Sequence, residues 1–277
     1  MARSEPRAMA RGRRLPLASL ALVLGFAGPD AAAGPVPTEA AYVPVPATTF
    51  TSVIESEPAT KSVAIAAYSM RTEPVTNAQF LAFVGANPQW RRDRVPSVFA
   101  EGRYLGHWQG PAELGEQALP DQPVTRVSWF AAQAYCESEG ARLPSWLEWE
   151  RAASASATLE DARKDPAWRQ QMLDWYAKPS RDALASVGGE ANLFGVRDLH
   201  GLVWEWVDDF GAMMVTSDSR DQNDPDRLKF CGAAAMSLRD RDNYALLMRI
   251  AMLSSLQAVD TTNNLGFRCA RDGAATP

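Results

Sequence analysis

The sequence predicts a single α+β domain with several helices, short strands and long loops. Its 277 residues are 46% hydrophobic and 22% charged, a composition typical of a globular protein that can bury a sizeable core. Between about residues 76 and 176, helix-start signals are followed by apolar residues at helical spacing. Beyond that point the helical periodicity fades, and short β-like pieces alternate with Gly, Asn and Asp, which indicates long loops.

The first 33 residues have the pattern of an export signal. Arg13 and Arg14 precede an apolar run over 15–26, and three alanines at 31–33 offer a small-residue cleavage site. Because this run is shorter than the ~20 residues that cross a bilayer, we expect cleavage and no transmembrane anchor. General secretion and twin-arginine export both stay open, and the expected location is periplasmic or secreted. The expected organisation is an export signal at 1–33, a linker at 34–44, a folded domain at 45–272 and a tail at 273–277.

The first two helices of the domain are indicated by the residues at which they start and stop. Thr76, with Gln79 three residues later, forms a capping-box pattern, and the helix should run to about Ala86. A second helix should start at Ser128 and end at Gly140, since glycine readily adopts the conformation that follows a helix.

The third and fourth helices are indicated in the same way. Ser145 and Glu148 form a second capping-box pattern. Asp165 followed by Pro166 is typical of an N-cap and the first helical position. After these helices, the stretch 202–207 is expected to form a short strand.

The charge of the chain argues against nucleic acid as a partner. The formal net charge is −5, and residues 1–33 contain five arginines and only two acids, so the mature chain is more acidic still. Proteins that bind nucleic acid concentrate Lys and Arg on one face, and the sequence shows no such cluster.

The chain has three cysteines, Cys136, Cys231 and Cys269. In an oxidising compartment the simplest arrangement is one disulfide and one odd thiol. The spacing of the three residues alone does not choose the pair. The odd thiol is either a small buried hydrophobic group or a reactive one.

Four separated segments together resemble the formylglycine-generating enzyme, or sulfatase-modifying-factor, family. They are EPVTNAQFLAFV at 73–84, QPVTRVSWFAAQAYCESEGARLPSWLEWERAA at 122–153, NLFGVRDLHGLVWEWV at 192–207 and NNLGFRCARD at 263–272. The resemblance implies a compact domain with a core like that of C-type lectins. It also implies a disulfide between Cys136 and Cys269, which would leave Cys231 free.

The same resemblance places Ser237 and Asp242 where cysteine-oxidising members of the family have the two cysteines that bind copper(I). Copper(I) prefers soft thiolate ligands, whereas a hydroxyl and a carboxylate are hard donors, so copper is not expected here. Ala234 also stands where active relatives have a serine. The alternative is that Cys231 supplies a ligand from a shifted register.

Other metals of the superfamily fit the chain no better. Its iron-dependent sulfoxide synthases bind Fe(II) through three histidines, and this chain has only His107 and His200. Many relatives bind calcium with an asparagine at the position of Leu202. A backbone carbonyl and Glu205 would remain as ligands for a hard cation, which is a depleted set. No metal is therefore assigned, calcium stays open as the weaker alternative, and we expect His200 to be structural.

Arg142, Arg249 and Arg268 stand among apolar residues, where an unpaired charge would be costly. Each is therefore expected to contact a carboxylate or a carbonyl group. The candidate carboxylates are Glu148, Glu150, Asp198 and Glu205.

These observations favour an exported accessory or tailoring protein that acts on a protein or peptide in the periplasm. The sequence resembles the accessory proteins encoded beside copper nitrite reductases and, less closely, a branch that tailors pyoverdine precursors. Ser237, Asp242 and Arg249 would then form the pocket, with Asp242 as a base if burial raises its pKa. One alternative is oxidation of a substrate cysteine to formylglycine at an altered site, and another is a binding module without catalysis.

Overall fold

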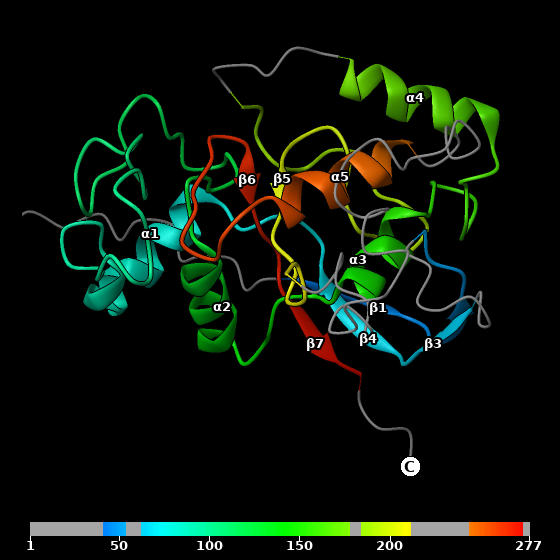
Figure 1. Cartoon of the computed structure of the whole chain (residues 1–277), viewed down its shortest axis with the longest axis horizontal. Helices are drawn as coiled ribbons and strands as arrows, with labels where there is room; N and C mark the ends of the chain where they lie inside the picture. The colour runs from blue at the N-terminus through cyan, green and yellow to red at the C-terminus, as the bar shows by residue number, and fades with distance from the viewer. Residues whose placement is uncertain (1–40, 54–61, 178–183, 212–243, 274–277) are drawn as a thin grey trace, which may run out of the picture. The chain divides into compact units, whose positions relative to one another are not determined.

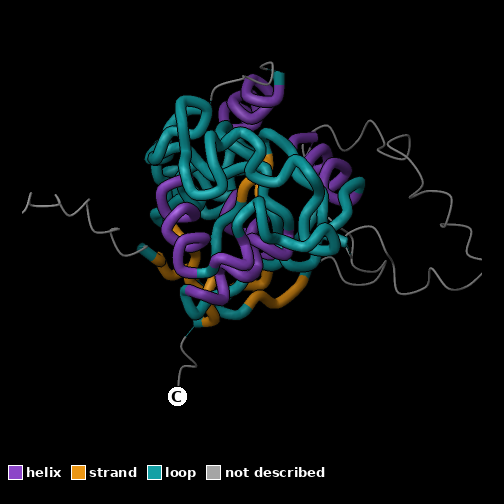
Figure 2. The backbone as a smooth tube through the Cα atoms, turned by 90° about the vertical axis from the view of Figure 1, so that its left-hand side faces the viewer, coloured by secondary structure: helices purple, strands orange, loops and turns teal. Residues whose placement is uncertain are grey.

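The structure is a computed structural model of the chain, and it describes residues 41–53, 62–177, 184–211 and 244–273. These residues form a mixed arrangement of helices and strands, as the sequence predicts, with long loops between the elements (Figure 2). The helices are α1 (Asn77–Ala86), the short 3-10 helix η1 (Pro88–Trp90), α2 (Trp129–Ser138), α3 (Trp146–Ala153), α4 (Pro166–Tyr176) and α5 (Tyr244–Ser254). The strands are β1 (Tyr42–Val45), β2 (Thr48–Phe50), β3 (Val63–Ile65), β4 (Tyr68–Arg71), β5 (Trp204–Glu205), β6 (Leu265–Gly266) and β7 (Ala270–Asp272).

The four helix starts expected from the sequence are confirmed. The side chain of Thr76 caps α1 and that of Ser145 caps α3, and both form complete capping boxes. Ser128 accepts a hydrogen bond at the start of α2, and Asp165 does so at the start of α4. Polar side chains at these positions satisfy backbone N–H groups that the first turn of a helix leaves without partners.

The strands form three small sheets (Figure 1). β4 lies between β1 and β7 with both neighbours antiparallel, so the two ends of the described domain meet in one sheet. β2 pairs with β3, and β5 pairs with β6 in parallel. The predicted strand over 202–207 is therefore present but shortened to β5.

The first strand begins within the stretch expected to be a linker. Residues 34–44 were expected to be irregular, yet β1 starts at Tyr42 and pairs with β4 through Val45. Pro44 lies within this strand, opposite Ser69. A proline is tolerated there because β1 is an edge strand of the sheet and does not need a donor on its outer side.

The core is built largely from aromatic side chains. Phe80 of α1, Tyr135 of α2 and Phe267 lie with their ring centroids 5.3 to 6.0 Å apart. On α3, Trp146 and Trp149 are buried and their ring centroids are 5.8 Å apart. Such rings supply the buried area that a loop-rich domain cannot obtain from extended sheets. Among the described residues, no helix has both the length and the apolar character needed to cross a membrane.

Candidate functional site

One of the three predicted pocket residues can be placed. Arg249 lies in α5, whereas Ser237 and Asp242 lie outside the described residues, together with Ala234 and Cys231. α5 follows directly on the segment 212–243 that contains those positions. The surroundings of Arg249 therefore define the described part of the candidate pocket.

Arg249 points into the core, with only 1% of its surface exposed. Its guanidinium carbon lies 3.5 Å from the centroid of the Trp149 ring, a close cation–π contact. Its Nη2 donates a hydrogen bond to the backbone oxygen of Glu205 in β5. The residue thus links α5 to α3 and β5, and its role in the described part of the chain is to position the helix.

The carboxylate of Glu205 is the centre of this buried network. Arg268 donates to it from Nε and Nη2 at 2.8 to 3.0 Å, and both residues are fully buried. The indole N–H of Trp149 donates to Oε2 of Glu205 at 2.7 Å. Both carboxylate oxygens therefore already accept hydrogen bonds from a guanidinium group, and Oε2 also accepts one from an indole N–H.

The hydrogen bonds to Glu205 limit its ability to bind a metal ion. A hard cation at Glu205 would have to displace Arg268, and it would bring positive charge next to Arg249. In the described ranges, no group of three or more His, Cys, Asp or Glu side chains is arranged to bind a metal ion. Glu205 is thus unsuited to the calcium alternative that the sequence left open.

His200 lies beside the same network. Its Nε2 is 2.7 Å from the backbone oxygen of Ala153, and its ring lies edge-on to Trp149 and Trp168, with centroids 5.8 and 5.6 Å away. Desolvation lowers the pKa of His200 to about 4. The imidazole is therefore neutral near pH 7 and contacts protein groups, in agreement with the structural role expected from the sequence.

Arg142 and Asp198, two other residues for which the sequence predicted an ionic partner, have different contacts. Arg142 donates to Glu148 through both Nη atoms at 2.7 Å, and it also donates to the exposed Asp272. Asp198 instead accepts hydrogen bonds from the backbone N–H groups of Gly188 and Gly189. The sequence identified suitable carboxylates without specifying which arginine each would contact.

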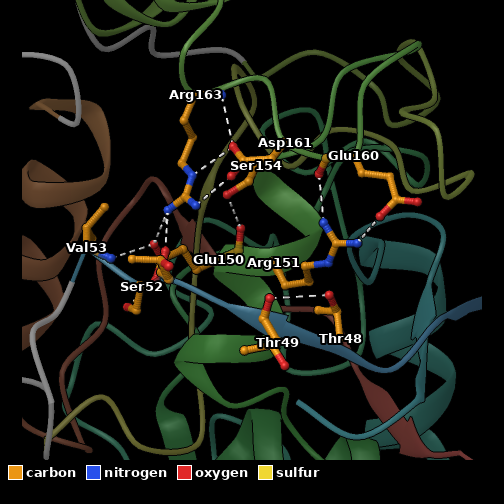
Figure 3. A network of polar contacts seen from close by, with 11 residues as sticks. Thr48, Thr49, Ser52, Val53, Glu150, Arg151, Ser154, Glu160, Asp161 and Arg163 are labelled. Carbon is orange, nitrogen blue, oxygen red and sulfur yellow. Dashed lines mark hydrogen bonds and ion pairs between the residues drawn. The ribbon is translucent and has the colours of Figure 1, made fainter. Parts of the chain in front are cut away.

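Glu150 is a second fully buried carboxylate, and Figure 3 shows the network around it. It accepts hydrogen bonds from the hydroxyl of Ser52, from the backbone N–H of Val53 at 2.8 Å and from Arg163 at 3.1 Å. Burial raises the pKa of Glu150, while these donors act in the opposite direction. No sequence pattern indicated Arg163 as its partner.

The structure joins Cys136 of α2 to Cys269, the pair that the family resemblance implies. Both cysteines are fully buried. The bridge closes a long loop, because its two ends are 133 residues apart in the sequence. Since the chain has three cysteines, Cys231 is the one cysteine outside this bridge.

A family model described as "Sulfatase-modifying factor enzyme 1-like domain" matches residues 29–273. The formylglycine-generating enzyme of Streptomyces coelicolor is 30% identical over 191 residues, which cover 61% of this chain and 60% of that protein. The hercynine oxygenase of Mycolicibacterium thermoresistibile is 29% identical over 179 residues, covering 56% of this chain and 38% of that protein. The chain thus spans about 60% and 38% of the lengths of these two relatives. A crystal structure of CarF covers 85% of this chain and is itself covered to 99%, with a TM-score of 0.46 and 16% identity.

Proposed function

Since the chain belongs to the sulfatase-modifying factor enzyme 1-like domain family, we propose that it is an exported accessory or tailoring protein that binds a peptide or protein partner. It does so without the two-thiolate copper chemistry that the family resemblance associates with cysteine oxidation. The partner that we propose is a periplasmic protein such as a copper nitrite reductase.

The observation that carries this proposal is the disulfide between Cys136 and Cys269. A copper(I) site of the family type needs two thiolates, because copper(I) prefers soft sulfur ligands. With two of the three cysteines bonded to each other, one chain retains a single thiol, that of Cys231. The donor set of this chain therefore does not fit a two-thiolate copper site.

The buried network under α5 supports a binding role. Arg249, Glu205 and Arg268 contact protein groups in the core, so these charged groups serve to place α5 and β5. Rigid elements of this kind can present a binding surface formed by the loops that they support. The disulfide supports export, since such bonds persist in oxidising compartments.

A peptide assay separates this proposal from formylglycine formation. The oxidised protein, supplied with copper(I) and oxygen, is incubated with a cysteine-containing sulfatase peptide, and aldehyde is detected by mass spectrometry after capture with a hydroxylamine probe. The Streptomyces coelicolor enzyme serves as the positive control. We expect no aldehyde, and multiple turnovers would overturn the proposal in favour of the oxidase.

A maturation assay tests the partner. A copper nitrite reductase is expressed in a bacterial periplasm with and without this chain, and its copper content and specific activity are measured. We expect both to increase when the chain is present, and an unchanged enzyme would remove nitrite reductase as the partner. The variant Asp242→Asn tests the proposed base, because full maturation by that variant would exclude a proton-transfer role for Asp242.

A further inference from the structure

Val98 and Phe99, called here the apolar pair, are neighbours in the sequence and both are exposed to solvent. Val98 has 65% of its surface exposed and Phe99 has 40%. Single exposed apolar residues are common on protein surfaces, whereas adjoining ones form a patch, and larger patches mark interaction sites. Neither residue of the apolar pair belongs to the candidate pocket around Arg249.

Two other aromatic rings hold the Phe99 ring in place. Its centroid lies 6.0 Å from that of Trp90 in η1 and 5.4 Å from that of Phe130 in α2. Both of these residues are half-buried, and the hydroxyl of Tyr104 donates to the backbone oxygen of Trp90 at 3.0 Å. Phe99 is therefore fixed on the surface of the domain by packing against η1 and α2.

Short-range hydrogen bonds fold the backbone around the apolar pair into a compact loop over residues 91–104. The backbone N–H of Phe99 donates to the oxygen of Pro96 at 2.9 Å, and that of Val95 donates to the oxygen of Arg91 at 2.8 Å. Since the loop makes these tight turns, its charged residues stay near the apolar pair.

The same loop carries more positive than negative charge. It contains four arginines and two acidic residues. Arg91 forms an ion pair with Asp93 at 3.0 Å, and Arg103 forms one with Glu101 at 3.0 Å. The side chain of Arg103 is nevertheless 71% exposed. Both acidic residues are thus neutralised within the loop.

Arg92 and Arg94 supply the excess positive charge, because neither has a carboxylate partner in the part of the chain that the structure describes. Arg92 donates to backbone oxygens, among them that of Trp108 at 2.8 Å. Arg94 is exposed. The chain as a whole has a formal net charge of −5, so this loop differs in sign from the rest of the molecule. Its charge favours an anionic partner.

We propose that this loop binds the surface of an anionic lipid bilayer. Val98 and Phe99 insert between the headgroups and the acyl chains, and Arg94 and Arg103 face the lipid phosphates. Membrane-surface segments combine apolar side chains with cations in this way, because apolar burial and the attraction to anionic lipids act together. The inference goes beyond the proposed function, and lipid binding is measured separately from maturation, so a failure of either leaves the other intact.

A second copy of the chain suits this surface less well. In a two-fold symmetric dimer the same surface meets itself, so the arginines of the two loops would face one another. Two exposed side chains also supply only a small part of the ~1,200 Å² or more that stable interfaces bury. A bilayer provides both the negative charge and the apolar interior that the loop lacks.

Sedimentation with lipid vesicles tests this inference. The protein is purified from a bacterial periplasm and mixed with vesicles of phosphatidylcholine, alone or with an equal part of phosphatidylglycerol. The double variant Val98→Ser with Phe99→Ser removes the apolar pair, and Leu173→Ser removes a side chain of α4 that is also 40% exposed. Arg94→Gln removes a charge from the loop, and Lys164→Gln removes one from an exposed position outside it. Thermal unfolding of each variant shows whether the fold is intact.

A further variant guards against loss of the Phe99 packing. Val98→Glu leaves the contacts of Phe99 with Trp90 and Phe130 in place and introduces a negative charge at the most exposed position of the apolar pair. We expect it to prevent binding to the anionic vesicles without lowering the unfolding temperature.

We expect the unmodified protein to bind the anionic vesicles more tightly than the neutral ones, and less tightly in 1 M salt, which screens the arginines. The double variant should weaken binding by at least about tenfold, and Arg94→Gln by about fivefold. Leu173→Ser and Lys164→Gln should stay within about twofold of the unmodified protein, because neither residue would touch the lipid.

Three results would overturn the proposal. They are equal binding to both kinds of vesicle, no binding to either, and equal losses in the loop variants and their controls. Sedimentation velocity of the protein without lipid identifies the other occupant. Dimers that form with rising concentration and are absent in the double variant would assign the apolar pair to a second copy of the chain and would also overturn it.

Discussion

Glu205 and Glu150 are both fully buried, yet the chain surrounds them differently. Glu205 faces the paired N–H groups of Arg268, which is itself fully buried, and the indole N–H of Trp149. Glu150 accepts hydrogen bonds from a hydroxyl, from a backbone N–H and from Arg163, the last at 3.1 Å. The two sites share burial but differ in the charge and geometry of their donors. That difference should decide how much each carboxylate contributes to stability.

The largest expected effect comes from breaking the Glu205 site. Arg268→Met would leave a carboxylate in the core without its cation, and such losses typically cost about 3–5 kcal/mol. Urea unfolding of the oxidised protein measures the change. The double variant Glu205→Gln with Arg268→Met is the control, because it removes both charges and should recover part of the loss. A cost below about 1 kcal/mol for Arg268→Met would contradict the importance of this pair.

Glu150→Gln should be milder. The amide retains the size of the side chain but has one acceptor oxygen, whereas Ser52 and Val53 donate to different oxygens of the carboxylate. It also loses the charged contact with Arg163. We expect a loss of about 1 kcal/mol at neutral pH, from the mismatch between the amide and the donors around it. Removal of the charge itself should cost little, because burial raises the pKa of Glu150 and so disfavours its ionised form in the folded protein. Urea unfolding of this variant and of Arg268→Met under the same conditions compares their losses in the free energy of unfolding. A loss equal to that of Arg268→Met would show that donor geometry does not distinguish the sites.

The pH dependence of the free energy of unfolding tests the Glu150 site separately. Because burial raises the pKa of Glu150 in the folded state, the folded protein takes up this proton more readily than the unfolded chain does. The stability that Glu150 contributes should therefore rise as the pH falls from above the raised pKa toward the ordinary value, 4.5. The free energy of unfolding of the unmodified protein minus that of Glu150→Gln should increase over this interval. A difference that is flat, or that falls as the pH falls, would contradict the assigned direction.

The smallest effect is expected at an exposed pair. Asp272 contacts Arg142, but its side chain is 83% exposed. We expect Asp272→Asn to cost less than about 1 kcal/mol, as is usual for surface ion pairs. The same unfolding series in 1 M salt should reduce the effect further, because salt screens exposed charges. An effect comparable to that of Glu150→Gln would mean that burial is not the controlling variable.

Helix starts could be predicted because they depend on neighbouring residues. Thr76, Ser145 and Asp165 act through backbone N–H groups within the next three positions, and the structure confirms each cap. α5 was missed because YALLMRIAMLS is apolar around most of its circumference and shows little periodicity. The strands were largely missed because each has only two to four residues and depends on partners distant in sequence.

The site could be predicted only in part, for a related reason. Residue type showed that Arg268 and Arg249 needed partners, and Glu205 was among the candidates. Choosing Glu205 for Arg268 requires the pairing of β5 with β6, which brings together residues 63 positions apart. Ser237 and Asp242 lie outside the described residues and stay predictions.

The most direct test of the proposed function is a count of free thiols. The protein is purified without reductant, unfolded in guanidinium chloride and titrated with a chromogenic disulfide reagent before and after reduction. The disulfide between Cys136 and Cys269 predicts one reactive thiol per chain before reduction, that of Cys231, and three afterwards. Three thiols in the unreduced protein would restore the sulfur ligands that copper(I) requires and would contradict the account.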